Sequence, residues 1–281
     1  MIDIVTTLPD LRERIAQWKR GGQRIGFVPT MGNLHDGHHS LVRLARGHAD
    51  VVIASVFVNP THFGPGEDLA RYPRTQEADA EGLAAAGGDL AWMPTVEAMY
   101  PLGIGNAVQV RVPGITDVLE GAHRPGHFDG VCTVVARLFN QVQPDVAAFG
   151  RKDYQQLAVI RHLVRDLAFP VEVLAGDTVR EPDGLAMSSR NQYLSAGDRA
   201  AAPELYLTLQ RMRDDIRAGK PRGVVEAEAR AHLAAAGFAV DYAAVRTPGL
   251  AEPDAVAGAR VAMVAARLGG TRLIDNLEFD L

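Results

Sequence analysis

The chain has 281 residues, of which 47% are hydrophobic and 22% charged, and its formal net charge is -5 at pH 7. This composition is typical of a folded globular protein, and the negative charge argues against nucleic acid or an anionic membrane as a partner. Cys132 is the only cysteine and no run of about 18 apolar residues occurs, so we expect a cytoplasmic protein without a disulfide or a membrane-spanning segment.

The first elements along the chain are predicted to form a strand–helix–strand unit. Thr7 and Asp10 have the spacing of a capping box, and apolar residues at helical spacing follow until Gly21 ends the helix. The run at residues 24–28 predicts a short buried strand. After a turn and a second helix, the β-branched run Val51–Val58 is typical of a strand covered on both faces.

Strands and helices continue to alternate in the rest of the first domain. We expect strands at residues 89–93, 108–112, 145–150 and 171–176, with helices near 75–86, 131–142 and 157–167. Alternation of this kind predicts an α/β fold with a Rossmann-like, doubly wound parallel sheet. We place this domain at residues 1–176.

The pattern changes at residue 177, where turn residues replace the periodic apolar positions. Two amphipathic helices follow, the first over residues 205–216 and the second from residue 225 to Gly237. The apolar runs at 238–246 and 261–269 predict strands. Residues 177–281 are therefore expected to form a second, smaller α/β domain.

The turn "PTMGNLHDGH" at residues 29–38 follows the first buried strand and leads into a helix. Ligands of parallel sheets bind beyond the carboxyl ends of the strands, and Gly32 and Gly37 allow a phosphate to approach the main chain. His35 and His38 are three residues apart and point to one side of a helical turn. Three interpretations follow: a solvated polar turn, a His-x-x-His metal site, or two imidazoles that bind nucleotide phosphates.

Two later turns carry polar residues that suit the same chemistry. The segment "AMSSRN" at residues 186–191 offers two hydroxyls and a guanidinium, which can hold phosphates and neutralise a departing pyrophosphate. The segment "FGRKDYQQL" at residues 149–157 again follows a strand and contains Lys152. Each segment is also compatible with an ordinary turn. In the segment at residues 149–157, Asp153 would then cap the next helix.

These motifs resemble those of a known family. The His35–His38 tetrapeptide is similar to the HIGH motif of nucleotidylyltransferases and class I aminoacyl-tRNA synthetases, and "AMSSRN" is similar to their KMSKS element. The full turn, together with "EGAHRPGHFDGV", "FGRKDYQQL", "DGLAMSSRNQYLS" and "ARLGGTRLIDN", resembles the pantothenate synthetase (pantoate–β-alanine ligase) family along nearly the whole chain. The resemblance implies a nucleotidylyltransferase-type sheet and a homodimer.

The resemblance also implies a reaction and its small-molecule substrates. The family condenses pantoate with β-alanine, using ATP and Mg²⁺, to give pantothenate, AMP and pyrophosphate through an enzyme-bound pantoyl adenylate. His38, His35, Lys152 and Arg190 would be the catalytic residues, with His38 in the position of the proton donor. The residues implied to bind ATP are Met31, Gly32, Asn33, Leu34, His35, Asp36, Gly37 and His38 in the first turn, Gly150, Arg151, Lys152 and Asp153 in the second, and Val179, Met187, Ser188, Ser189 and Arg190 in the third.

The chain departs from the family pattern at one substrate position. His62 replaces a glutamine that is implied to contact both pantoate and β-alanine, whereas Gln156 matches a pantoate-binding glutamine. An imidazole is shorter than a glutamine side chain, and its two nitrogens lie on opposite ring edges. We therefore expect weakened pantoate binding, unless the ring turns outward and a neighbour or water replaces it.

Mg²⁺ is expected to be held mainly by phosphate oxygens, with Asp89 as a candidate protein ligand. A strand-end residue that faces water is the alternative for Asp89. Two other functions stay open at this stage. One is a HIGH-motif nucleotidylyltransferase that acts on a phosphorylated acceptor, and the other is a metal-binding protein without transferase activity.

Overall fold

A computed structural model describes residues 2–64, 68–254 and 257–281. The chain divides into two compact units, and each is described by itself. Unit 1 contains residues 1–150 and 159–177, and unit 2 contains residues 151–158 and 178–281. The division differs from the single boundary expected after residue 176, because residues 151–158 belong to the C-terminal unit.

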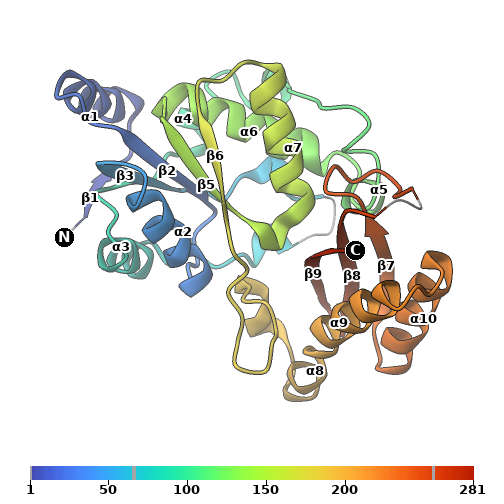
Figure 1. Ribbon diagram of the computed structural model, residues 1–281. Helices are drawn as coiled ribbons and strands as arrows, with labels where there is room; N and C mark the ends of the chain where they lie inside the picture. Colours follow the sequence, from blue (N-terminus) through green and yellow to red (C-terminus); the bar gives the residue numbers. More distant parts are fainter. Residues whose placement is uncertain (1, 65–67, 255–256) are drawn as a thin grey trace. The chain divides into compact units, whose positions relative to one another are not determined.

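Unit 1 is built on a six-stranded, wholly parallel sheet in the order β1-β4-β3-β2-β5-β6 (Figure 1). Its strands are β1 (Asp3–Val5), β2 (Ile25–Thr30), β3 (Val51–Val56), β4 (Leu90–Trp92), β5 (Val146–Gly150) and β6 (Glu172–Gly176). From β2 the chain passes through a helix to β3 on one side, and from β5 it passes to β6 on the other. The sheet therefore reverses its winding direction between β2 and β5, as the expected Rossmann-like fold requires.

Helices cover both faces of this sheet. Val28 packs in one cluster with Val42 and Leu83, which come from two helices on the same face, whereas the ring of neighbouring Phe27 contacts Phe139 on the opposite face, with centroids 6.5 Å apart. Neighbouring strand residues point to opposite faces, which gives three layers. The helices that begin in unit 1 are α1 (Leu8–Arg20), α2 (Asp36–Arg46), α3 (Gln76–Ala85), α4 (Val96–Met99), α5 (Glu120–His123) and α6 (His127–Val142). A further helix, α7 (Tyr154–Asp166), begins in unit 2 and continues into unit 1.

Unit 2 contains a three-stranded antiparallel sheet in the order β7-β8-β9 (Figure 1). Its strands are β7 (Ala239–Arg246), β8 (Ala259–Leu268) and β9 (Thr271–Asp280), and its helices are α8 (Ala196–Ala201), α9 (Glu204–Arg217) and α10 (Arg222–Ala235). Leu209 of α9 and Leu233 of α10 are fully buried with Val264 of β8 in one apolar cluster. Burial of these side chains stabilises the layer of helices on the sheet.

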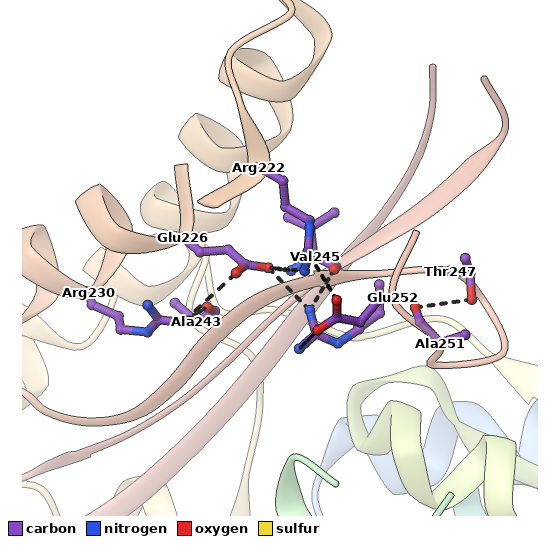
Figure 2. Close-up of polar contacts among 9 residues, drawn as sticks. Arg222, Glu226, Arg230, Ala243, Val245, Thr247, Ala251 and Glu252 are labelled. Atoms are coloured by element: carbon purple, nitrogen blue, oxygen red, sulfur yellow. Dashed lines mark hydrogen bonds and ion pairs between the residues drawn. The ribbon is translucent and has the colours of Figure 1, made fainter. Parts of the chain in front are cut away.

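A polar network joins α10 to β7 within this unit (Figure 2). The buried carboxylate of Glu226 accepts the backbone N–H of Val245 at 2.8 Å and contacts Arg246 at 3.2 Å and Arg222 at 3.3 Å. Exposed Glu252 adds a second contact to Arg222 at 3.1 Å. A buried carboxylate needs such partners because an unsatisfied charge in the interior is costly.

Several expected elements differ from the structure. Residues 108–112 were expected to form a strand, but they lie outside both sheets, and the N–H of Val110 donates to the Thr133 hydroxyl at 2.9 Å. The short β1 and the long β9 were not predicted. The Thr7 cap is confirmed, since its hydroxyl accepts the N–H of Asp10.

Candidate functional site

Three of the expected segments follow strands of unit 1 at the carboxyl edge of its sheet. Thr30, which ends β2, lies in register with Val56, which ends β3, and the N–H of Phe57 donates to the carbonyl of Thr30 at 3.1 Å. Gly150 ends β5, the other neighbour of β2. The structure therefore brings the histidine turn, the segment that leads to His62, and Gly150 to the topological switch point, where open parallel sheets bind ligands.

His35 and His38 cap the amino end of α2 with their imidazoles. The N–H of Gly37 donates to Nδ1 of His35 at 3.1 Å, and the N–H of His35 donates to Nδ1 of His38 at 3.3 Å. The two ring centroids are 4.1 Å apart. Because each Nδ1 acts as an acceptor, the proton of the neutral ring lies on Nε2. The cap thus fixes both rings in the tautomer that donates from Nε2.

Asp79 of α3 holds the turn that precedes these histidines. Gly32 and Asn33 have φ values of 82° and 52°, and the carboxylate of Asp79 accepts the N–H of Asn33 at 3.0 Å and of Leu34 at 2.8 Å. A Cβ on Gly32 would lie 3.0 Å from the same carboxylate. Asp79 is only 2% exposed and was not predicted. The one sequence signal for its burial is the spacing of four residues between Asp79 and the apolar Leu83, which places both on the same face of a helix.

These contacts determine which donors the turn can offer to an anion. Asp79 takes the N–H groups of Asn33 and Leu34, and the ring of His35 takes that of Gly37. With Nδ1 as the acceptor in both rings, the neutral imidazoles of His35 and His38 each carry their N–H donor on Nε2. His39 lies against α3 instead, since a Cβ on Gly82 would be 2.5 Å from its Nε2.

His62 ends the 3-10 helix η1 (Pro60–His62), which follows β3. Its ring packs edge-on against that of His127, with centroids 4.4 Å apart, and its carbonyl accepts Nδ1–H of His127 at 3.0 Å. The close approach of α6 to this segment depends on Gly130, because a Cβ there would lie 2.1 Å from the Thr61 carbonyl. These contacts fix the backbone that carries His62.

Apart from Asp89, the remaining candidates belong to unit 2. Lys152 lies in the 3-10 helix η4 (Arg151–Asp153), where its ammonium is 3.9 Å from the Asp153 carboxylate, and Gln156 lies half-buried in the first turn of α7. Arg151 forms an ion pair with Glu278 of β9. This ion pair gives Arg151 a structural contact within unit 2, in addition to the ATP-binding role expected from the sequence.

The third turn is the end of a small hairpin in the same unit. Residues Arg180 and Ala186 form an antiparallel bridge, and the N–H of Met187 donates to the carbonyl of Val179 at 2.9 Å. Ser188 then caps the 3-10 helix η5 (Ser189–Tyr193), since its hydroxyl accepts the N–H of Arg190 at 3.2 Å. The hairpin therefore presents residues 187–190 on a defined backbone.

The structure does not bring Asp89 to the histidine turn. Asp89 lies at the amino end of β4, the opposite edge of the parallel sheet from Thr30, and its carboxylate accepts the N–H of Val52 at 2.7 Å and pairs with Arg46. Its position contradicts the expected role as a magnesium ligand. Among the described residues, no group of three or more His, Cys, Asp or Glu side chains is close enough to hold a metal ion.

Two further expectations concern a possible lid and membrane-spanning helices. The sequence of residues 63–75, with Gly64, Pro65 and Gly66, suggests a wall or lid over a ligand cavity, but residues 65–67 of this segment lie outside the described residues. Within the described ranges, every helix is too short or too polar to cross a membrane.

Comparison with known proteins gives matches over nearly the whole chain. The model of the family described as pantoate-beta-alanine ligase matches residues 3–278. A protein of Stenotrophomonas maltophilia named pantothenate synthetase is 64% identical over 99% of this chain and 100% of its own length, and one of Xanthomonas axonopodis is 65% identical with the same coverage.

Solved structures agree with these sequence matches. The pantothenate synthetase of Thermus thermophilus is 50% identical, with a TM-score of 0.91 over 98% of this chain and 99% of that one. The pantoate-beta-alanine ligase of Francisella tularensis, solved in complex with beta-gamma ATP and beta-alanine, is 32% identical, with a TM-score of 0.83 over 99% of this chain and 97% of that one.

Proposed function

The chain belongs to the pantoate-beta-alanine ligase family, and from that premise we propose that it condenses pantoate with β-alanine in an ATP-dependent reaction. Pantothenate, AMP and pyrophosphate are the products, and a pantoyl adenylate is the intermediate. The observation that carries this proposal is the family match over residues 3–278, which includes the histidine turn at the switch point of the sheet.

In the first step, the pantoate carboxylate attacks the α-phosphorus of ATP. A new C(O)–O–P bond forms, the bond from phosphorus to the bridging oxygen breaks, and pyrophosphate leaves with that electron pair. A carboxylic acid of this type has a pKa of about 3.5 and is ionised at pH 7, so the step needs no general base. The protein instead has to stabilise negative charge that develops around phosphorus.

His35 and His38 are suited to that electrostatic role. The cap of α2 leaves the proton of each neutral imidazole on Nε2, and the amino end of the helix dipole adds a favourable field for an anion. We propose that both Nε2–H groups donate to phosphate oxygens of ATP. Removing one such preorganised donor typically lowers a rate by about 10²- to 10³-fold.

The basic residues of unit 2 would neutralise the departing pyrophosphate. We propose that Lys152 and Arg190 supply positive charge, while Ser188 and Ser189 donate from their hydroxyls. Mg²⁺ is proposed to accompany ATP and to neutralise part of the phosphate charge. Because the described side chains form no cluster that could hold a metal alone, phosphate oxygens would supply most of its ligands.

In the second step, the neutral amine of β-alanine attacks the acyl carbon of the adenylate. An amide bond forms, the carbonyl–oxygen bond to AMP breaks, and the amine loses its proton to solvent. Only the unprotonated amine is a nucleophile, so the rate of this step should rise with pH. We propose that His62 and Gln156 bind pantoate, with His62 also near β-alanine, and that the protein is a cytoplasmic homodimer.

The test is to follow AMP formation with ATP, pantoate and β-alanine together, and then with each acid omitted. We expect steady AMP release only in the complete mixture. Exchange of labelled pyrophosphate into ATP should require pantoate but not β-alanine, because the adenylate forms reversibly in the first step. No pantoate-dependent exchange, but transfer of AMP to a phosphorylated acceptor, would instead support the alternative nucleotidylyltransferase.

A further inference from the structure

One face of β9 holds the turn that carries Lys152. The side-chain amide of Asn276 donates to the backbone carbonyls of Arg151 and Lys152, at 2.9 Å each. Two residues farther along the same face, Glu278 pairs with the Arg151 guanidinium and accepts the Tyr154 hydroxyl at 2.9 Å. Side chains two residues apart on a strand point to the same side, which explains why Asn276 and Glu278 both contact residues 151–154. Asn276 is buried, at 6% exposure.

The opposite face of β9 holds the hairpin that leads to Ser188. The carboxylate of Asp275, which is 4% exposed, accepts two hydrogen bonds from the Arg180 guanidinium, at 2.6 Å and 2.9 Å. Arg180 also donates to the carbonyl of Gly184 at 3.0 Å and lies 3.6 Å above the ring of Tyr206. Because Arg180 is part of the bridge at the base of the hairpin, this fork anchors the hairpin to the strand.

The chemistry of the two neighbours fits these tasks. An asparagine amide has two N–H donors on one nitrogen, which suits two adjacent carbonyl acceptors, whereas an aspartate offers acceptors only. Burial raises the pKa of the Asp275 carboxyl, and the Arg180 guanidinium opposes that rise. Since arginine stays protonated, the two hydrogen bonds from its guanidinium favour the ionised form of this carboxyl group.

We propose that Asp275 and Asn276 are positioning residues that fix two phosphate-binding segments, residues 151–153 and 187–190, relative to each other. Neighbouring residues of a strand point to opposite faces, so this dipeptide reaches both segments at once. The inference rests on the proposed function, because it assigns a catalytic purpose to the placement of Lys152. It also predicts a physical effect on the two segments that is measurable without any activity.

The kinetic test uses Asn276→Asp, which keeps the size of the side chain and removes both donors. We expect kcat to fall by about 10²-fold, since a misplacement of about 1 Å can have that effect, while the KM for ATP changes little because Lys152 acts on charge that develops later. In a Lys152→Ala background the same change should lower kcat by less than about twofold further. The matched control is Val264→Ala, a buried residue in register with Asp275 whose side chain packs in the apolar cluster under the helices.

A merely structural role predicts different results. At equal loss of thermal stability, Asn276→Asp would then lower kcat no more than Val264→Ala does. Alternatively, Asn276→Asp would lower kcat by the same factor in the Lys152→Ala background as in the wild type. Either result overturns the proposal. A wild-type kcat that survives Asn276→Asp within about twofold overturns it as well.

Hydrogen exchange separates this inference from the proposed function. Amides of residues 151–158 should exchange faster in Asn276→Asp than in Val264→Ala, and those of residues 180–190 should exchange faster in Asp275→Asn. If the wild-type protein forms no AMP, the proposed reaction fails, and this exchange experiment alone decides whether the dipeptide holds the two segments. Equal exchange in the variants and the control overturns the positioning role.

Discussion

The carboxylate of Asp79 accepts the backbone N–H of Asn33 at 3.0 Å, which ties a buried helix residue to the turn that precedes both candidate histidines. Asp79→Asn removes an acceptor and places N–H donors beside backbone N–H groups, so we expect a loss of about 1–3 kcal/mol in the free energy of unfolding. We also expect kcat/KM for ATP to fall by about tenfold or more, because His35 and His38 lose their support. Thermal unfolding and steady-state rates measure the two effects.

Glu81→Gln is the matched control for that change, since Glu81 lies on the exposed side of the same helix. It removes the same charge at a position that faces solvent and should alter neither quantity. An Asp79→Asn variant with the kinetics of the Glu81→Gln variant would contradict the supporting role.

His38→Ala tests the donor assigned to the phosphates. We expect kcat to fall by at least about 10²-fold, as for the loss of one preorganised donor. The variant also loses half of the helix cap, which should lower stability by only about 1 kcal/mol. His48→Ala is the control, because exposed His48 bonds to the carbonyl of Leu44 in the helix that precedes it. Activity near that of the wild type would rule out the role of His38.

Glu226 is expected to matter for stability and not for the reaction. Glu226→Leu leaves the buried N–H of Val245 without its acceptor and takes a carboxylate away from Arg246, so we expect a loss of about 2 kcal/mol or more. Glu252→Gln alters an exposed carboxylate that contacts the same arginine, and should lower stability by less than about 1 kcal/mol. Urea unfolding measures both losses, and equal losses would refute the importance of burial.

The parts of the fold that were predictable have local signals. The β-branched run of β3 and the cap at Thr7 depend on neighbouring residues, so the first strand–helix–strand unit and its turn followed from the sequence. Residues 108–112 show the limit of such signals. Their alternation is typical of a strand, but Val108 is 74% exposed, because pairing with a sheet depends on tertiary placement.

The residues that were missed act through long-range contacts. Asp79 and Asn276 bond to backbone groups 45 or more positions away along the chain, and no spacing rule reports such a partner. In β9, buried Asp275 and Asn276 interrupt the apolar pattern, which hid the strand. Polar residues at buried positions break the pattern from which strands are predicted, and here they hold the proposed site.

His62 gives a prediction specific to this chain. An imidazole reaches less far than the glutamine that the family pattern has at this position, so we expect His62→Gln to lower the KM for pantoate, with little change in thermal stability. The substitution removes the ring contact with His127 but keeps the His62 backbone carbonyl that accepts Nδ1–H of His127, so the surrounding backbone should stay in place. His123→Gln is the control, since it makes the same exchange of side chains at an exposed position in α5. A pantoate KM that is unchanged or higher in His62→Gln, measured at saturating ATP and β-alanine, would mean that this side chain does not limit pantoate binding.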